Sequence, residues 1–199
     1  ALSARPAGAL RLMRAWLAVF LLAWAGMAVA EERGMVCYGY GCVAEDSIRY
    51  SEGQLGTVRR MLFAATDAES ERHILADVIG LLYGWAGEQS DIANDRAGNY
   101  NDDNRPGKMD CIDHSTSTTR LLRLLAGRGY LRWHRVLEPQ VRSVASVLFV
   151  HWSAVIEEWP VAEEVVPARF AVDSWFVDNG YPAVILPLEE WKKGAGPDV

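Results

Sequence analysis

Two polar residues, His151 and Asp173, lie inside segments that are otherwise apolar. The segments 146–156 and 169–177 are rich in valine and aromatic residues, a composition typical of buried strands. Burying an imidazole or a carboxylate costs several kcal/mol unless each finds a partner. We therefore expect the two strands to be neighbours and the two side chains to meet.

Cys111 is the cysteine left without a partner. The chain has three cysteines, and Cys37 and Cys42 can form a disulfide across a short loop that contains two glycines. Cys111 directly precedes the segment 112–126, whose leucines recur at helical spacing and which ends at Gly127. A helix N-terminus favours a thiolate through its free N–H groups and its dipole. The sequence thus predicts a reactive thiol at the start of a helix.

Residues 1–30 have the features of a secretory signal peptide. A start that carries three arginines precedes an apolar core at 15–25, and Ala28-Val29-Ala30 is a small-x-small cleavage pattern. An uncleaved membrane anchor is the alternative, but the apolar run is shorter than the roughly 20 residues that a spanning helix needs. We expect cleavage after Ala30 and a periplasmic or secreted protein, an oxidising location in which Cys37 and Cys42 can pair.

The remaining chain, 31–199, has the length of a single domain with its own core. The leader takes three of the 20 basic residues and none of the 26 acidic ones, so the mature chain has a net charge of −9. Such a surface repels nucleic acid and anionic lipid. We therefore expect no nucleic-acid partner, and no membrane association after cleavage.

The pattern along the chain predicts an α+β domain with a helical N-terminal half and an antiparallel C-terminal sheet. Acidic and capping residues at 45–47 favour a first helix through Ala65, and a broad apolar face predicts a second helix from Ser70 to Trp85. A polar, irregular segment follows at 89–110, before the helix at 112–126. The expected later elements are strands at 130–137, 146–156, 169–177 and 182–186, a turn at Asp178-Asn179-Gly180 and a short helix at 188–193.

A cysteine opening a helix, a histidine on a later strand and an aspartate on the next form the pattern of an activated thiol nucleophile. The blocks 110–114, 151–156 and 171–175 resemble the transglutaminase-like branch of the papain-like cysteine protease superfamily, and in particular the bacterial transglutaminase-like cysteine proteinases. The resemblance covers about residues 99–190, the expected catalytic core. The helical part, 31–98, resembles no family that we can name.

The resemblance implies a papain-like core and acyl transfer through a thioester, without a cofactor or a metal. It assigns the nucleophile to Cys111, the general base to His151 and the orienting carboxylate to Asp173. The implied substrate is a peptide or protein, with the cell envelope as one source, and the reaction is hydrolysis or transamidation. The Cys111 N–H and an upstream side chain are expected to form the oxyanion hole, with Asn104, Asn101 and Asn99 as candidates.

Other assignments remain open at this stage. His114 lies one helical turn after Cys111, but a neighbour at that spacing is poorly placed to face a substrate. His134 is expected in the core or on a strand surface. Asp178 is an alternative to Asp173, although its place before Asn179-Gly180 is explained by the turn.

Two non-enzymatic functions also remain open. One is a catalytically inactive binding module that retains the fold and holds a peptide or an envelope partner. The other is a metal-binding protein that uses Cys111, Asp113 and His114. The acidic run 91–103 lacks the spacing and the terminal glutamate of an EF-hand loop, so we expect it to be a solvated loop.

Overall fold

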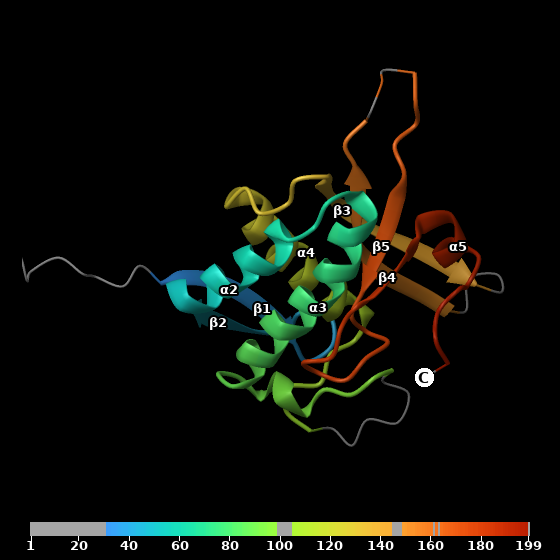
Figure 1. The fold of residues 1–199 in the computed structure, drawn as a ribbon. Helices are drawn as coiled ribbons and strands as arrows, with labels where there is room; N and C mark the ends of the chain where they lie inside the picture. Colours follow the sequence, from blue (N-terminus) through green and yellow to red (C-terminus); the bar gives the residue numbers. More distant parts are fainter. Residues whose placement is uncertain (1–30, 99–104, 145–148, 161, 163, 199) are drawn as a thin grey trace, which may run out of the picture. The chain divides into compact units, whose positions relative to one another are not determined.

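The computed structural model describes residues 31–98, 105–144, 149–160, 162 and 164–198. From Glu31 onward the chain forms one compact unit. Figure 1 draws a small sheet in blue and a larger sheet in yellow to red, with helices between them in the sequence. The elements are β1 Glu32–Tyr38, β2 Ala44–Tyr50, α2 Glu52–Phe63, α3 Ala68–Gly87, the 3-10 helix η1 Asp91–Asn94, α4 Cys111–Gly127, β3 His134–Val144, β4 Phe149–Glu158, β5 Arg169–Asp173, β6 Val184–Pro187 and α5 Leu188–Lys192.

This arrangement confirms the α+β class, but the helices are not confined to the N-terminal half. The segment 44–50, expected to begin a helix, is the strand β2, which pairs antiparallel with β1. Ile48 and Tyr50 are buried in alternation with exposed residues, and this two-residue period outweighs the acidic capping signal before it. The helix α2 begins only after Ser51, whose side chain accepts a hydrogen bond from the Gln54 N–H in a capping box.

The predicted second helix is confirmed as α3. Asp67 caps it through the Ser70 N–H, so it begins two residues earlier than its apolar face suggests. Its buried side chains, which include Leu75, Ile79 and Leu82, belong to the main core. No helix in the described part of the chain combines the length and apolar character needed to cross a membrane.

The larger sheet has the antiparallel order β3-β4-β5-β6. Ala154 and Ile156 of β4 join the main core together with leucines of α4, whereas Val155 joins a smaller core with Trp191 of α5. Because successive strand residues point to opposite faces, α4 covers one face of this sheet and α5 covers the other. The helix that begins at Cys111 therefore packs directly on the strand that carries His151.

The strand boundaries shift from their predicted positions. The first strand of this sheet starts at His134 rather than at residue 130, and β5 ends at Asp173 rather than at residue 177. Beyond Asp173 the chain turns, with the Val177 N–H donating to the Ser174 carbonyl. The predicted turn at 178–180 is present, with Gly180 at φ +86°, but it lies within a longer connection to β6.

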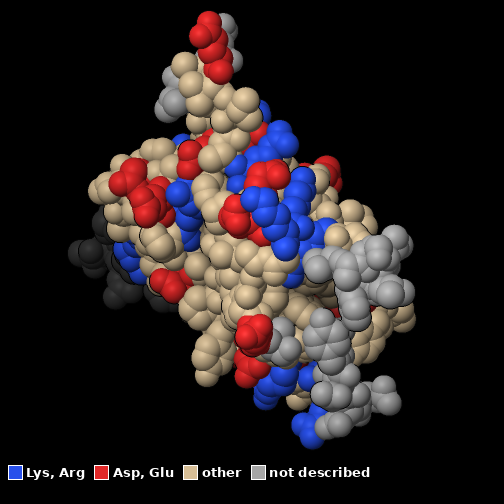
Figure 2. Space-filling model, turned by 90° about the vertical axis from the view of Figure 1, so that its right-hand side faces the viewer, with Lys and Arg blue, Asp and Glu red and all other residues tan. Residues whose placement is uncertain are grey.

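Charged side chains of opposite sign are interleaved on the face shown in Figure 2. Across the larger sheet, Arg135 and Arg169 both bind the buried Glu157 carboxylate. Burial raises the pKa of Glu157, but the hydrogen bonds and charges of the two guanidinium groups lower it by more than burial raises it. The net pKa of Glu157 therefore lies below its usual value. These pairs join β3, β4 and β5 at the end of the sheet opposite to His151.

Candidate active site

Cys111 is the first residue of α4, at the position that the sequence predicts for the nucleophile. The Asp110 side chain caps this helix and accepts hydrogen bonds from the N–H groups of Ile112 and Asp113, both at 2.9 Å. In return, the Asp110 N–H donates to the Asp113 carboxylate at 3.1 Å, which completes a capping box. The cap satisfies the second and third N–H groups of the helix, and within the described part of the chain the Cys111 N–H has no acceptor.

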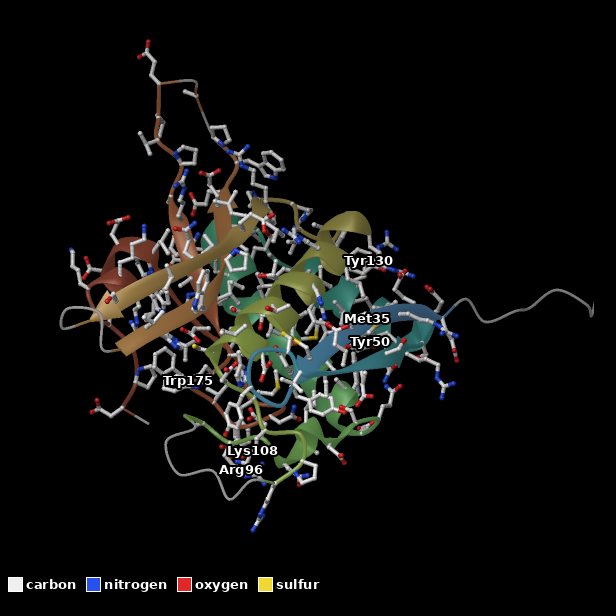
Figure 3. The ribbon with its side chains drawn as sticks, turned by 180° about the vertical axis from the view of Figure 1, so that it is seen from behind. Met35, Tyr50, Arg96, Lys108, Tyr130 and Trp175 are labelled. Carbon is white, nitrogen blue, oxygen red and sulfur yellow. A yellow bond between two sulfur atoms is a disulfide. The ribbon has the colours of Figure 1, made fainter. Side chains whose placement is uncertain are left out.

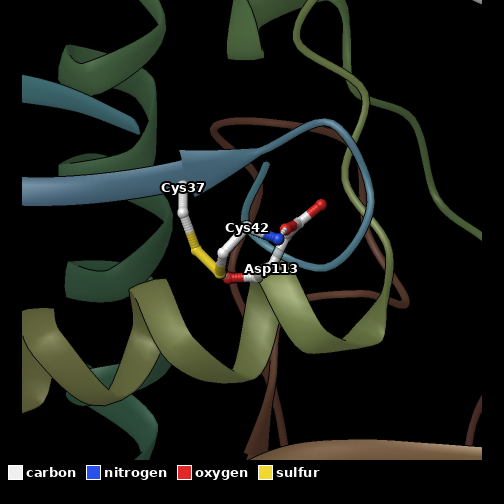
Figure 4. A group of neighbouring side chains, drawn as sticks. All are labelled: Cys37, Cys42 and Asp113. Carbon is white, nitrogen blue, oxygen red and sulfur yellow. Dashed lines mark hydrogen bonds between the residues drawn. A yellow bond between two sulfur atoms is a disulfide. The ribbon is translucent and has the colours of Figure 1, made fainter. Parts of the chain in front are cut away.

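The Cys37–Cys42 disulfide is confirmed, and its loop lies against the start of α4 (Figure 4). The Tyr40 and Cys42 N–H groups both donate to the Asp113 carboxylate, the former at 2.8 Å. The Cys37 N–H donates to Ser117 Oγ, at 2.9 Å, one turn further along the helix. The disulfide loop is thus tied to the helix turn that carries Cys111.

The sulfur atoms of Cys37 and Cys42 and a carboxylate oxygen of Asp113 lie within 4.8 Å of one another. Metal ligation by cysteine requires thiolates, which a disulfide does not provide, and both Asp113 oxygens already accept backbone N–H groups. Burial raises the pKa of Asp113, and the backbone hydrogen bonds offset this only in part. We interpret this group as a structural clamp.

The structure brings Cys111, His151 and Asp173 together. The Cys111 Sγ lies 3.9 Å from the carbonyl oxygen of Val150, the residue before His151. Asp173 Oδ2 lies 2.7 Å from His151 Nε2. Burial lowers the pKa of His151, but the hydrogen bonds and charges of Asp173 and Cys111 together raise it above its ordinary value of 6.5. The imidazole is therefore stabilised in its protonated form, between a carboxylate and a thiol.

The Asp173 carboxylate is buried and held by two further donors. The Trp191 indole N–H donates to Oδ2 at 2.8 Å, and the Trp175 backbone N–H donates to Oδ1 at 3.3 Å. These bonds fix the carboxylate that orients the imidazole, because both of its oxygens are already occupied.

Aromatic rings surround the imidazole of His151. Trp175, labelled in Figure 3, has its ring centroid 4.7 Å away, and Phe176 and Trp191 lie at 5.6 and 5.7 Å. The contact of Trp191 with Asp173 is not predicted by the sequence: the spacing of Leu188 and Trp191 indicates a helix that packs inward, but nothing local indicates that its indole reaches Asp173. These rings exclude water from the His151–Asp173 pair and so strengthen their interaction.

The other candidates lie elsewhere. Asp178 accepts a hydrogen bond from the Ala97 N–H at 2.9 Å and thus acts in a loop contact. His134 is buried against Glu71, with Nδ1 2.8 Å from Oε1. His114, one helical turn beyond Cys111, is buried against Ser174 and Asp95.

The metal set of Cys111, Asp113 and His114 is not assembled, because its three side chains have partners in different directions: Val150, the disulfide loop and Ser174. The oxyanion-hole candidates Asn99, Asn101 and Asn104 lie outside the described residues. The segments that flank them lie side by side, as Arg96 and Lys108 do in Figure 3, and the Asn94 side chain donates to the Pro106 carbonyl at 3.1 Å.

No protein-family model, curated protein or solved structure matches the chain. The assignment of the site therefore depends on the residue types and their geometry.

Replacing Asp173 by asparagine is expected to lower the pKa of His151. The carboxylate charge that raises this pKa is lost, whereas the burial that lowers it remains. We expect this pKa to fall, as followed by the pH dependence of the His151 ring resonances in an NMR titration. The matched change Asp178→Asn removes a carboxylate from the neighbouring loop and should leave the His151 titration unaltered. An unchanged titration in Asp173→Asn would contradict the assigned pair.

Proposed function

We propose that the protein is an exported cysteine hydrolase or acyltransferase that acts on peptide or amide bonds through Cys111, His151 and Asp173. One observation carries the proposal: a buried carboxylate hydrogen-bonds one nitrogen of His151, whose imidazole also interacts with an unpaired thiol at a helix N-terminus. Each of these three groups has the surroundings that its role in nucleophilic catalysis needs.

In the first half-reaction, the Cys111 thiolate attacks the carbonyl carbon of the substrate and a C–S bond forms. The Cys111 N–H, left free by the helix cap, donates to the oxygen on which negative charge develops. The His151 imidazolium gives its proton to the leaving amine as the C–N bond breaks. The acyl group is then held on Cys111 as a thioester.

In the second half-reaction, His151 takes a proton from water or from an amine as that group attacks the thioester. The C–S bond breaks, the sulfur leaves as thiolate, and with the proton now on His151 the starting thiolate and imidazolium are restored. Water gives hydrolysis, whereas an amine gives transamidation. Throughout, Asp173 holds the His151 ring and stabilises its positive charge, and Trp191 keeps Asp173 in place.

A transglutaminase-like, papain-like core is supported by the arrangement of a cysteine-bearing helix against an antiparallel sheet. The nucleophile opens α4, and His151 and Asp173 lie on the adjacent strands β4 and β5. The order of the three residues along the chain agrees with this family, and we propose the family on these grounds.

The proposed location is the periplasm or the extracellular space. The disulfide favours an oxidising compartment, and residues 1–30 have the composition of a signal peptide. The acidic mature chain favours a peptide or protein substrate, including proteins of the cell envelope, over nucleic acid.

The alternative is an inactive binding module, which would keep the same three residues as packing groups. It is disfavoured because Cys111 is partly exposed, as a nucleophile must be, rather than enclosed like a packing cysteine.

The test is product formation by the exported protein with a mixture of peptides and a labelled primary amine. Mass spectrometry should detect new peptide termini for hydrolysis, or amine adducts for transamidation. Cys111→Ala should give neither, because no thioester can form. Thr116→Ala, on the same helix, serves as the matched control and should remain active. Equal product formation by Cys111→Ala would refute the thioester, and a wild-type protein that forms no product would favour the binding module.

A further inference from the structure

A second group of polar side chains lies buried around His114, one helical turn beyond Cys111 on α4. His114 Nδ1 lies 2.9 Å from Ser174 Oγ, and His114 Nε2 lies 3.0 Å from Asp95 Oδ2. All three residues are at most 5% exposed. The angles at the second contact are not those of a hydrogen bond, so it is a close polar contact rather than a directed bond.

Two more hydroxyl groups extend this cluster. Ser174 Oγ lies 2.9 Å from Thr118 Oγ1, which in turn lies 3.0 Å from the Tyr83 hydroxyl. Ser174 is therefore held by two side chains of α4, one helical turn apart. Buried polar networks of this kind stabilise one arrangement, because any displacement leaves several groups unpaired in a low-dielectric interior.

The cluster joins the two elements that must be in register for the proposed chemistry. His114 lies one helical turn beyond Cys111, and Ser174 directly follows Asp173. Asp95 adds a third connection, since its Oδ1 accepts the Met109 N–H at 2.9 Å, two residues before Cys111. His114 therefore contacts both the residue that follows Asp173 and the carboxylate that holds the chain just before Cys111. The positions of the thiol and of the Asp173 carboxylate both depend on the His114 side chain.

Substrate has no access to His114. The space between His114, Asp95, Ser174 and the 177–181 loop is a cavity of about 10 Å³, which is room for no more than one water molecule. Asp95 Oδ2 and His114 Nε2 are buried on its wall. The imidazole is therefore excluded as a base that contacts substrate.

We propose that His114 is a positioning residue that fixes the nucleophile helix relative to the Asp173–His151 pair, through Ser174 and Asp95. The proposal rests on the proposed function of Cys111 and His151. Its physical basis is that a misplacement of about 1 Å at a reacting group can cost about a hundredfold in rate. Loss of the His114 side chain should then lower the reactivity of Cys111 in the folded protein, in addition to any loss in the free energy of unfolding.

The test is the rate of Cys111 alkylation by iodoacetamide as a function of pH, measured by intact mass on the folded protein. In His114→Ala we expect the rate below neutral pH to fall about tenfold or more, and the profile to move towards that of an unassisted thiol. His114→Asn should recover part of the rate, because an asparagine amide can still hydrogen-bond Ser174. Ser174→Ala removes only one hydroxyl group and should also lower the alkylation rate below neutral pH.

His134→Ala provides the matched control. His134 is as buried as His114 and also contacts a carboxylate, Glu71, but lies at the far end of the sheet. It should lower the free energy of unfolding and leave the alkylation profile unchanged. An equal shift in His134→Ala, or an unshifted profile in both His114→Ala and Ser174→Ala, overturns the positioning role. A wild-type profile without enhanced reactivity below neutral pH would instead refute the proposed function itself.

Discussion

Replacing His151 by glutamine is expected to slow iodoacetamide alkylation of Cys111 by about a hundredfold at pH 6.5. An unassisted thiol, with a pKa near 8.5, is only about 1% ionised at this pH. In the wild-type protein the raised pKa of His151 keeps a positive charge beside the sulfur, which favours the thiolate. Glutamine retains a polar side chain but carries no charge, so the thiol loses this stabilisation.

The pH dependence follows from the direction of the His151 shift. Because this pKa is raised, the imidazolium persists above pH 6.5 and is lost only as the pH rises through the folded-state value. The difference in alkylation rate between wild type and His151→Gln should therefore be largest at low pH and should disappear in alkali, where any thiol ionises. Turnover should decline only as the pH rises through this raised pKa of His151, because the leaving amine then receives no proton from the imidazole.

The matched control is His73→Gln, an exposed histidine on α3. It should leave the alkylation rate of Cys111 unchanged at every pH. Equal rates in wild type and His151→Gln at pH 6.5 would mean that the imidazole does not act on the thiol, and the enzymatic proposal would be abandoned.

Replacing Glu71 by leucine is expected to lower the free energy of unfolding by about 3–5 kcal/mol, because three buried donors lose their acceptor at about 1–3 kcal/mol each. The Glu71 carboxylate is fully buried. Its Oε2 accepts the Arg132 N–H at 2.7 Å, and its Oε1 lies 3.1 Å from the Trp133 nitrogen and 2.8 Å from His134 Nδ1. Leucine has a similar volume but leaves these donors buried without an acceptor.

Urea denaturation monitored by tryptophan fluorescence measures this loss. The control is Glu69→Leu, two residues earlier on the same helix, where the side chain is 77% exposed. A substitution at such a surface position usually changes stability by no more than about 0.5 kcal/mol. A loss below about 1 kcal/mol in Glu71→Leu would show that the donors find other partners, and would contradict the role assigned to this carboxylate.

The elements that the sequence predicts correctly are those in which local pattern and tertiary burial agree. The leucines of α4 and the apolar strand around His151 are examples, because one face of α4 and both faces of β4 are buried in the core. The segment 44–50 was predicted wrongly because its acidic residues favour a helix start, while its pairing with β1 decides the structure. The local signal for this strand, the alternation around Ile48 and Tyr50, is short and is obscured by the acidic residues before it.

The meeting of His151 and Asp173 was predictable because each is a costly exception in an apolar strand. Trp191 was not, since a tryptophan in a short amphipathic helix is equally compatible with simple packing. His114 was set aside for its spacing from Cys111, and the structure adds a reason, its burial against Ser174 and Asp95. The signal that could have revealed the cluster around His114 is the presence of a polar residue on the face of α4 whose leucines are buried in the core.

The position of α4 in the chain has a consequence for folding kinetics. Its side chains reach back 80 positions to Cys37 and forward 60 positions to Ser174. Contacts of such large sequence separation carry a high loop-closure entropy and form slowly. Since Trp191 follows Asp173 in the chain, a polypeptide synthesised from its N-terminus completes the thiol and the disulfide loop before the imidazole and carboxylate are in place. The reactive centre is therefore complete only when Trp191 of the last helix has reached Asp173.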